Sequence, residues 1–180
     1  MKINCVLLAA GNSRRFKGNK LLYQVNGKPL YQAALDILLP IPWNRMILVT
    51  QYPEIVQNVP KTVQVVWNHQ PDLGISHSIQ LGIEADLQAD AYLFSVCDQP
   101  YLTANSIEKL LELFVHSNKG IAALSYQGRS GNPVIFSKKY SRELLQLSGD
   151  QGGKMVLQQH TKDVSYWEVE HEIELMDIDR

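Results

Sequence analysis

The opening of the chain, MKINCVLLAAGNSRRFKGNK (residues 1–20), joins an apolar stretch to a small-residue, basic loop. Residues 2–9 are nearly continuously apolar, which is typical of a strand in a parallel sheet covered on both faces. Ala9, Ala10 and Gly11 then follow, and their small side chains let a ligand approach the backbone closely. In open parallel α/β sheets, ligands bind at the carboxyl ends of the strands. This stretch therefore predicts the fold class and the first candidate site together.

The rest of the chain alternates strand-like and helix-like segments. We expect further strands at residues 46–50, 63–67, 91–97, 121–126, 132–136, 164–169 and 175–178, and helices from Pro29, at 76–85, after an N-cap at Thr103 and at 140–147. This alternation predicts an α/β fold with a mostly parallel central sheet. No internal repeat or low-complexity linker divides the sequence, so we expect one domain over residues 1–180.

Composition excludes several classes of function. Of the 180 residues, 45% are apolar and 19% are charged, which is typical of a globular protein rather than a disordered one. Seventeen Lys and Arg against 18 Asp and Glu give a net charge of −1, so no basic nucleic-acid footprint is visible. There is no apolar run of about 18 residues for a membrane span, and no signal-peptide pattern. We expect a cytoplasmic protein, with Cys5 and Cys97 as reduced core thiols rather than a disulfide.

The first loop, residues 10–20, matches neither familiar phosphate-binding motif. A dinucleotide motif needs three glycines, of which only Gly11 is in place, and a P-loop needs Ser or Thr directly after Gly-Lys. Arg15 and Lys20 nevertheless supply positive charge for a polyphosphate, and Arg offers it a bidentate fork. An exposed basic loop that binds nothing is the alternative that composition leaves open.

The pattern Leu-Ala-Ala-Gly-x-Ser-x-Arg, followed by Lys-Leu-Leu, resembles the signature loop of the nucleotidyltransferases that make nucleotide-sugars and related diphosphates. The resemblance implies a Rossmann-like three-layer α/β/α fold. Arg15 and Lys20 would act in catalysis by holding the triphosphate and stabilising charge in the transition state. The residues of this loop to which the resemblance gives nucleotide contacts are Ala9, Ala10, Gly11, Ser13, Arg15 and Lys20.

A second candidate loop, Ser-Val-Cys-Asp-Gln-Pro at residues 95–100, places a carboxylate directly after a strand. Asp98 could ligate Mg²⁺, which prefers carboxylates and substrate phosphates; a turn-forming Asp is the alternative. Cys-Asp-Gln-Pro resembles the same segment of the molybdenum cofactor nucleotidyltransferases, particularly the cytidylyltransferase type. The guanylyltransferase type more often has Leu-Ala-Gly-Gly in its first loop, so Ala10 favours cytidine over guanosine.

Further segments gain roles from the same resemblance. Gly-Ile-Ser-His-Ser-Ile at 74–79 implies nucleotide contacts near Ser76 and Ser78, with a simple N-cap at Ser76 as the alternative. Contacts with the acceptor are implied for Asn132, Asp150 and Lys154. Asn132 stands where the family commonly has histidine, and it can form hydrogen bonds but not titrate.

Two segments of the C-terminal third carry further interpretations. Asp150 could instead cap a new helix after a helix stop at Gly149. The chain ends with Met-Asp-Ile-Asp-Arg, which resembles the Asp-Ile-Asp that the family usually follows with Thr-Pro-Glu-Asp. The resemblance makes Asp179 the second metal ligand beside Asp98.

The resemblance as a whole implies an enzyme that transfers CMP from CTP to the phosphate of molybdenum-molybdopterin and releases pyrophosphate. Asp98 and Asp179 would hold Mg²⁺, and the acceptor phosphate would attack the α-phosphorus in line. A molybdoenzyme or its chaperone would be the protein partner, with no role for nucleic acid or a membrane. The alternatives are a guanylyltransferase of the same group, a sugar- or polyol-phosphate nucleotidyltransferase, and a non-catalytic accessory protein that delivers the cofactor.

Overall fold

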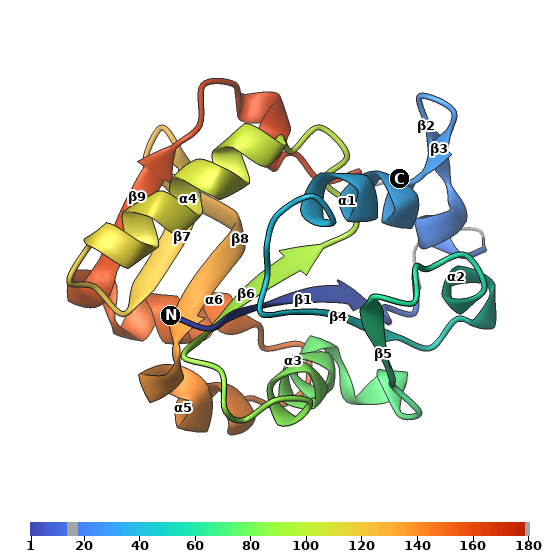
Figure 1. Ribbon diagram of the computed structural model, residues 1–180, viewed down its shortest axis with the longest axis horizontal. Helices are drawn as coiled ribbons and strands as arrows, with labels where there is room; N and C mark the ends of the chain where they lie inside the picture. Colours follow the sequence, from blue (N-terminus) through green and yellow to red (C-terminus); the bar gives the residue numbers. More distant parts are fainter. Residues whose placement is uncertain (14–17, 179–180) are drawn as a thin grey trace.

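A seven-stranded sheet with strand order β5-β4-β1-β6-β8-β7-β9 forms the centre of the computed structural model, which describes residues 1–13 and 18–178 (Figure 1). Its strands are β1 (Ile3–Ala9), β4 (Arg45–Thr50), β5 (Val63–Trp67), β6 (Ala91–Val96), β7 (Ile121–Tyr126), β8 (Arg129–Ser137) and β9 (Val164–Glu168). A separate hairpin pairs β2 (Gln24–Val25) with β3 (Lys28–Pro29).

Most neighbouring strands run parallel. β5, β4, β1 and β6 pair in parallel, and so do β7 and β9. β8 is antiparallel to both of its neighbours, β6 and β7. The predicted α/β fold with a mostly parallel sheet is therefore confirmed, although nothing in the sequence had indicated which strand would run the other way.

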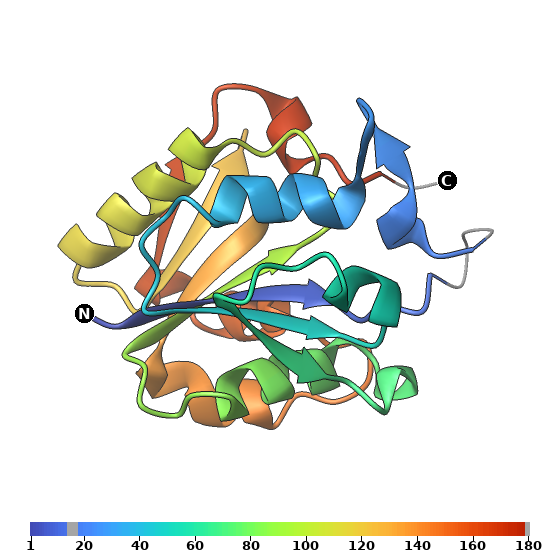
Figure 2. The ribbon, with the colours of Figure 1, turned by 45° about the vertical axis from the view of Figure 1, so that its right-hand side comes forward.

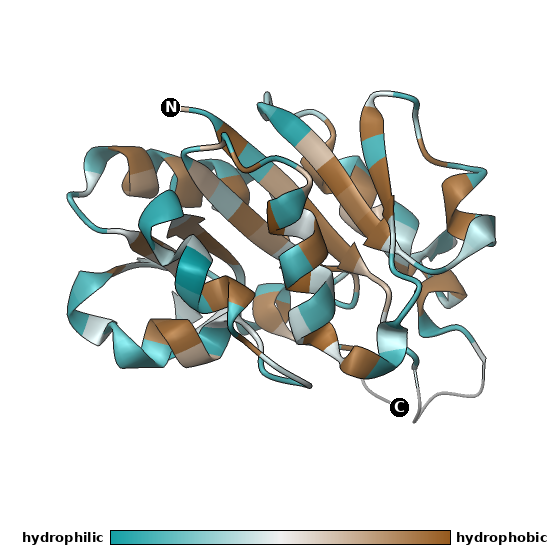
Figure 3. Ribbon diagram, turned by 90° about the horizontal axis from the view of Figure 1, so that it is seen from below, coloured by the Kyte–Doolittle hydropathy of each residue, from teal (hydrophilic) through white to brown (hydrophobic). Residues whose placement is uncertain are grey.

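Helices cover both faces of the sheet and make three layers (Figures 1 and 2). Buried side chains of α1 (Leu30–Leu38), α2 (Pro53–Val56) and α4 (Ala104–His116) join one apolar core. Those of α3 (Ile75–Glu84), α5 (Ser141–Leu145) and α6 (Gly153–Gln159) join the other. Apolar residues concentrate along the strands between these layers, as Figure 3 shows.

Strand β1 contributes to both cores, because its side chains alternate between the two faces of the sheet. Cys5 and Leu7 belong to the core under α1 and α4, and Val6 belongs to the core under α3. Helix α3 approaches β1 so closely that a Cβ on Gly82 would lie 2.4 Å from Val6 Cγ1. The glycine therefore fixes the depth at which α3 packs.

Several local predictions are confirmed. Thr103 is the N-cap of α4, and its hydroxyl oxygen accepts a hydrogen bond from the backbone N–H of Ser106 at 3.2 Å. Cys5 and Cys97 are both buried and free. Burial raises the pKa of the Cys5 thiol, and burial together with the charge of Asp98 raises the pKa of Cys97. None of the helices in the described ranges has the length and apolar character needed to span a bilayer.

The predicted strand at 175–178 is wrong. Residues Glu172–Leu175 form a single 3-10 turn, η5, and the chain then continues without joining the sheet. Four alternating residues are too few to specify a strand when side-chain contacts favour a turn, and here the carboxylate of Glu174 bonds to the first turn of α4. The capping role considered for Asp150 is also wrong, because the N-cap of α6 is Gly152.

A polar cluster joins η4 (Thr161–Asp163) to the segment before α5. Asp163 Oδ2 lies 2.7 Å from Lys139 Nζ and accepts a hydrogen bond from the Tyr140 hydroxyl at 2.5 Å. The bonds from Lys139 and then Tyr140 lower the pKa of Asp163 from its ordinary value of 3.8 to about 2. The ionised carboxylate therefore stabilises the fold above pH 4, and this contribution is lost as the pH falls from 4 to 2.

We expect Gly82→Ala to lower the free energy of unfolding by roughly 1–3 kcal/mol, because the added methyl group would overlap Val6. At an unobstructed helix position the same change would stabilise the protein by roughly 1 kcal/mol. Urea denaturation measures the difference. Combining Gly82→Ala with Val6→Ala should recover part of the loss, whereas purely additive effects would contradict the contact.

We expect Asp163→Asn to lower the free energy of unfolding at pH 7 by roughly 1 kcal/mol, because the cluster is partly exposed. The difference between the variant and the natural protein should shrink as the pH falls from 4 to 2. Urea denaturation at several pH values provides the measurement. A difference that stays constant over this range would show that ionisation of Asp163 is not its source.

Candidate active site

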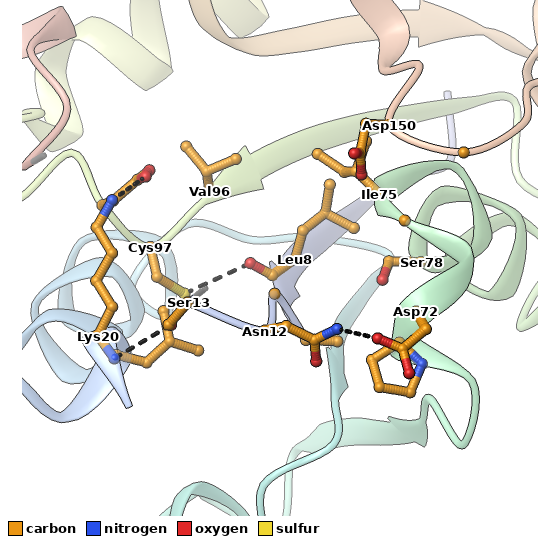
Figure 4. Close-up of a pocket in the computed structure, with 17 residues that line it drawn as sticks. Leu8, Asn12, Ser13, Lys20, Asp72, Ile75, Ser78, Val96, Cys97 and Asp150 are labelled. Atoms are coloured by element: carbon orange, nitrogen blue, oxygen red, sulfur yellow. Dashed lines mark hydrogen bonds and ion pairs between the residues drawn. The ribbon is translucent and has the colours of Figure 1, made fainter. Parts of the chain in front are cut away.

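Two adjoining cavities open at the carboxyl ends of β1 and β6. The first has a volume of about 390 Å³ and the second a volume of about 340 Å³. Leu8, Ile75 and Val96 line both cavities, so they form a shared wall. The position matches the rule that open α/β sheets bind ligands beyond the carboxyl ends of their strands. Figure 4 shows the residues around the first cavity.

Side chains from the end of β4 hold the first loop in place. Three successive carbonyl oxygens, at the last residue of β1 and the first two of the loop, each accept a hydrogen bond from one of three successive side chains: Ala9 from Thr50 Oγ1 at 2.9 Å, Ala10 from Gln51 Nε2 at 2.9 Å, and Gly11 from the Tyr52 hydroxyl at 2.6 Å. The loop therefore satisfies these carbonyls without regular secondary structure. Sequence reasoning missed Gln51 and Tyr52, because nothing in their spacing signals a contact with a loop 41 residues away.

The same loop lines the first cavity. Ala10, Gly11, Asn12 and Ser13 all face it, and nucleotide contacts are predicted for all of these except Asn12. Ala9 is buried just before the loop begins. Asn12 Nδ2 donates to Asp72 Oδ1 at 2.7 Å and so connects the loop to the turn that precedes α3 (Figure 4).

Lys20 and Asp98 form an ion pair inside the first cavity. Lys20 Nζ lies 2.9 Å from Asp98 Oδ2, and the two side chains are only 15% and 28% exposed. Lys20 begins the 3-10 turn η1 (Lys20–Leu22), and its backbone N–H donates to Ser13 Oγ at 3.2 Å. The structure thus brings together the basic and acidic residues predicted from separate loops. Arg15 and Asp179, which were predicted to act beside them, lie outside the described residues.

The start of α3 forms another side of the first cavity. Ser78 lines the cavity, and its hydroxyl oxygen accepts a hydrogen bond from Asn68 Nδ2 at 3.0 Å. Ser76 is buried and is not part of the lining; its backbone N–H donates to the Gly149 carbonyl oxygen at 3.2 Å. The N-cap of α3 is Gly74, so the alternative of an N-cap at Ser76 is wrong.

Gly74 and Gly149 cross at close range beside the cavity. Gly74 has a φ of +84°, and a Cβ there would lie 2.3 Å from the Gly149 carbonyl oxygen. Any other residue would meet both the torsional cost and the collision. The crossing fastens the loop that carries Asp150 to the amino end of α3, where partial positive charge favours an anion.

The residues predicted to bind the acceptor are divided between the two cavities. Asn132 and Lys154 line the second cavity, whereas Asp150 lines the first. Asn132 comes from β8, whereas Asp150 and Lys154 belong to one segment: Gly149 and Asp150 line the first cavity, and Gly152, Gly153 and Lys154 line the second.

The second cavity is lined by large apolar side chains together with a few polar ones. Its larger apolar side chains are Ile79, Phe94, Val134, Phe136 and Leu157, and its polar ones include Gln99, Asn132, Lys154 and Asp177. Gln99 Nε2 donates to the Leu175 carbonyl oxygen at 3.3 Å and to Asp177 Oδ1 at 2.9 Å. Sequence reasoning did not single out Gln99 or Asp177.

The arrangement can hold two ligands side by side. The first cavity offers a lysine, a loop with small side chains and a helix start, which suit a phosphorylated ligand. The second offers apolar surfaces and a few polar groups, which suit a flat or apolar ligand. Within residues 1–13 and 18–178, no three His, Cys, Asp or Glu side chains gather as metal ligands; Asp98 is the predicted ligand that falls in this part.

Comparison with characterised proteins supplies relatives. A molybdenum cofactor guanylyltransferase of Histophilus somni is 32% identical over 135 residues, which cover 74% of this chain and 67% of that protein. The bifunctional protein GlmU of Staphylococcus haemolyticus is 29% identical over 118 residues, which cover 62% of this chain and 26% of that protein. The chain thus matches about a quarter of the length of that GlmU.

Solved structures share the fold. The crystal structure of Rv0371C from Mycobacterium tuberculosis in complex with manganese has a TM-score of 0.79 at 20% identity, covering 94% of this chain and 89% of that one. The sequence profile of the MobA-like NTP transferase domain matches residues 5–164, which include the first loop, Asp98 and both cavities' strands. By this match, the chain belongs to the family of MobA-like NTP transferase domains.

Proposed function

We propose that this protein transfers CMP from CTP to the phosphate of molybdenum-molybdopterin and releases pyrophosphate, with residues 1–180 acting as one nucleotidyltransferase domain. The observation that carries the proposal is the pair of adjoining cavities that share Leu8, Ile75 and Val96 as a wall. Two substrates bound on either side of this wall would have their reacting groups close together. Positioning of this kind supplies much of the rate enhancement in phosphoryl-group transfer.

The nucleotide occupies the first cavity in this proposal. Lys20 and Arg15 would bind the triphosphate and offset the negative charge that develops during transfer. The start of α3 would add backbone N–H donors, and Ser78 would face the ligand. Ser76 would hold the helix start in place through the bond from its N–H to the Gly149 carbonyl oxygen. Ala10, Gly11 and Ser13 would contact the base and phosphates.

The preference for cytosine in this proposal rests on Ala10, which stands where the guanylyltransferase type more often has glycine. Ala10 lines the first cavity, and its carbonyl oxygen accepts a hydrogen bond from Gln51 Nε2 at 2.9 Å. A methyl group at this position leaves less room beside the backbone than glycine would, which favours the smaller pyrimidine ring over guanine.

Asp98 and Asp179 would hold a divalent cation, for which we propose Mg²⁺. The donor set fits, because Asp98 already binds a cationic group, the Lys20 ammonium at 2.9 Å, and because Mg²⁺ prefers carboxylates and phosphates. The ion would supply positive charge that offsets the negative charge of the phosphates. Lys20 would then be released from Asp98 to the phosphates.

The acceptor occupies the second cavity. Its flat ring system would lie against Phe94 and Phe136, while Asn132 and Lys154 would bind its polar and anionic groups. Asp150, from the first cavity, would meet the part of the acceptor that reaches the nucleotide. The acceptor phosphate would attack the α-phosphorus in line without a protein nucleophile. The product would then pass to a molybdoenzyme or its chaperone.

A guanylyltransferase of the same group is the second candidate. The Histophilus somni relative, at 32% identity, carries that name and favours it. The two candidates share the fold, the cavities and the proposed chemistry, and they differ only in the base that the first loop accepts.

We expect pyrophosphate release with Mg²⁺, molybdenum-molybdopterin and CTP, and little with GTP or ATP. A coupled phosphate assay measures it, with EDTA as the control that should stop the reaction. Release with GTP instead would replace the cytidylyltransferase by the guanylyltransferase. If no nucleotide gives pyrophosphate release with molybdenum-molybdopterin, but one of them gives release with a sugar or polyol phosphate, the proposed acceptor is wrong.

We expect Asp98→Ala to lower turnover by about 10²–10³-fold, the usual loss when one charge-stabilising group is removed. The melting temperature should stay close to that of the natural protein, because Asp98 lies in a cavity rather than in a core. Asp90→Ala is the matched control. Asp90 directly precedes β6, at the opposite end of the strand from Asp98, and its variant should keep full turnover. Normal turnover in Asp98→Ala would remove this residue from the mechanism.

A further inference from the structure

Glu174 is a buried carboxylate that lines neither cavity. It is 6% exposed, and its Oε2 accepts two hydrogen bonds, one from the Ser106 hydroxyl at 2.5 Å and one from the Thr103 hydroxyl at 2.9 Å. Both hydroxyls belong to the first turn of α4, a helix of 13 residues. Burial of a carboxylate is costly unless hydrogen bonds and positive potential compensate, and the two hydroxyls and the α4 amino end supply both.

Glu174 lies in a segment that we name the C-terminal strap, residues 172–178. The strap contains only one 3-10 turn and has no partner strand in the described residues, so no backbone ladder fixes its position. It lies beside the amino end of α4 at the top of the molecule (red in Figures 1 and 2). Its place therefore depends on individual side-chain and backbone contacts.

The strap carries part of the second cavity. Leu175 and Asp177 both line that cavity. Leu175 also packs on β8, where a Cβ on Gly131 would lie 3.1 Å from Leu175 Cδ1. Two further bonds reach the loop after β6: Gln99 Nε2 donates to Asp177 Oδ1 at 2.9 Å, and the Ile178 N–H donates to the Asp98 carbonyl oxygen at 2.8 Å.

Glu174 therefore connects α4 to the part of the strap that lines the second cavity. Leu175 follows Glu174 directly and Asp177 lies three residues further on, and the two hydroxyls at the start of α4 hold the other end of the connection. If the carboxylate lost its hydroxyl partners, the bonds from Gln99 to Asp177 and from the Ile178 N–H to the Asp98 carbonyl oxygen would lose the support of this connection to α4 and would open more often. The first cavity has no residue from the strap in its lining.

We propose that Glu174 is a positioning residue for the acceptor: its carboxylate fastens the strap to α4 so that Leu175 and Asp177 form a wall of the second cavity. The proposal rests on the proposed function, in which this cavity takes the phosphorylated acceptor. It assigns to Glu174 a larger effect on acceptor binding than on nucleotide binding, because Leu175 and Asp177 line the second cavity and not the first, whereas the strap reaches Asp98 through the Ile178 N–H alone.

The test compares Glu174→Ala with Glu174→Gln. In Glu174→Ala we expect the KM for molybdenum-molybdopterin to rise about tenfold, the equivalent of one to two hydrogen bonds, and the KM for CTP to rise much less. In Glu174→Gln the amide oxygen can still accept from both hydroxyls, so we expect most of the affinity to return. A merely stabilising role would change neither KM selectively.

The matched control is Glu172→Ala, from the same 3-10 turn. Glu172 pairs with Arg129 at the surface, and exposed pairs of this kind contribute little. This variant removes the same charge from the same segment, so both KM values should stay close to those of the natural protein. If Glu174→Ala does not fold, Ser106→Ala removes the shorter of the two bonds to the carboxylate and should raise the acceptor KM in the same direction.

Hydrogen exchange supplies a readout that does not need turnover. In Glu174→Ala the Ile178 amide should exchange faster, while amides in β1 and in the middle of α4 keep their protection. Unchanged acceptor KM with unchanged Ile178 exchange would overturn the proposal, and so would an equal rise in both KM values. Absence of turnover in the natural protein would instead overturn the proposed function, and the exchange rate of Ile178 would still decide whether Glu174 holds the strap.

Discussion

A loop can offer its backbone to a ligand only if its remaining backbone groups are satisfied by the protein itself, and this constraint governs the first cavity. β1 and β4 pair up to Ala9 and Thr50, the last residues of the parallel ladder. Beyond that point the side chains of Thr50, Gln51 and Tyr52 continue the pairing in place of the backbone. The loop after β1 can therefore leave the sheet without losing hydrogen bonds, which is costly for buried backbone groups.

The rest of the site follows from the course of that loop. Because the loop returns towards β6, Lys20 reaches Asp98, and a charged pair that is mostly buried forms between two segments separated by 78 residues. Both side chains keep part of their surface exposed, so each group can exchange its partner for an incoming ligand. The pair thus prepares the cavity for a ligand that carries negative charge and for a cation that accompanies it.

How much the sequence could predict depends on the range of the signals involved. Local patterns in the sequence predicted β1, β4, β6 and α4. Apolar runs indicate the three buried strands, and Thr103 is an N-cap residue directly before the helix. The loops with Lys20 and Asp98 could be found for the same reason, since they directly follow strands. Contacts between distant residues leave no such local pattern.

The errors illustrate this limit. The segment at 175–178 alternates like a strand, yet Glu174 bonds to Ser106, 68 residues earlier, and a turn results. The new helix considered after Gly149 does form, as α6, but Gly152 and not Asp150 is its N-cap, and Val156 and Leu157 pack it into the core. The division of Asp150 and Lys154 between two cavities likewise depends on the path of the backbone and not on their spacing.

The crossing of Gly74 and Gly149 has a consequence for how binding in one cavity can affect binding in the other. The loop from Gly149 leads within four residues to Gly153, where α6 begins at the second cavity, while Gly74 opens the helix beside the first. No side chain separates the two backbones at this crossing, and the Ser76 N–H donates to the Gly149 carbonyl oxygen at 3.2 Å. A ligand that shifted this contact from one cavity would therefore change the affinity of the other cavity for its own ligand. By thermodynamic linkage, the second ligand would change the affinity for the first by the same factor.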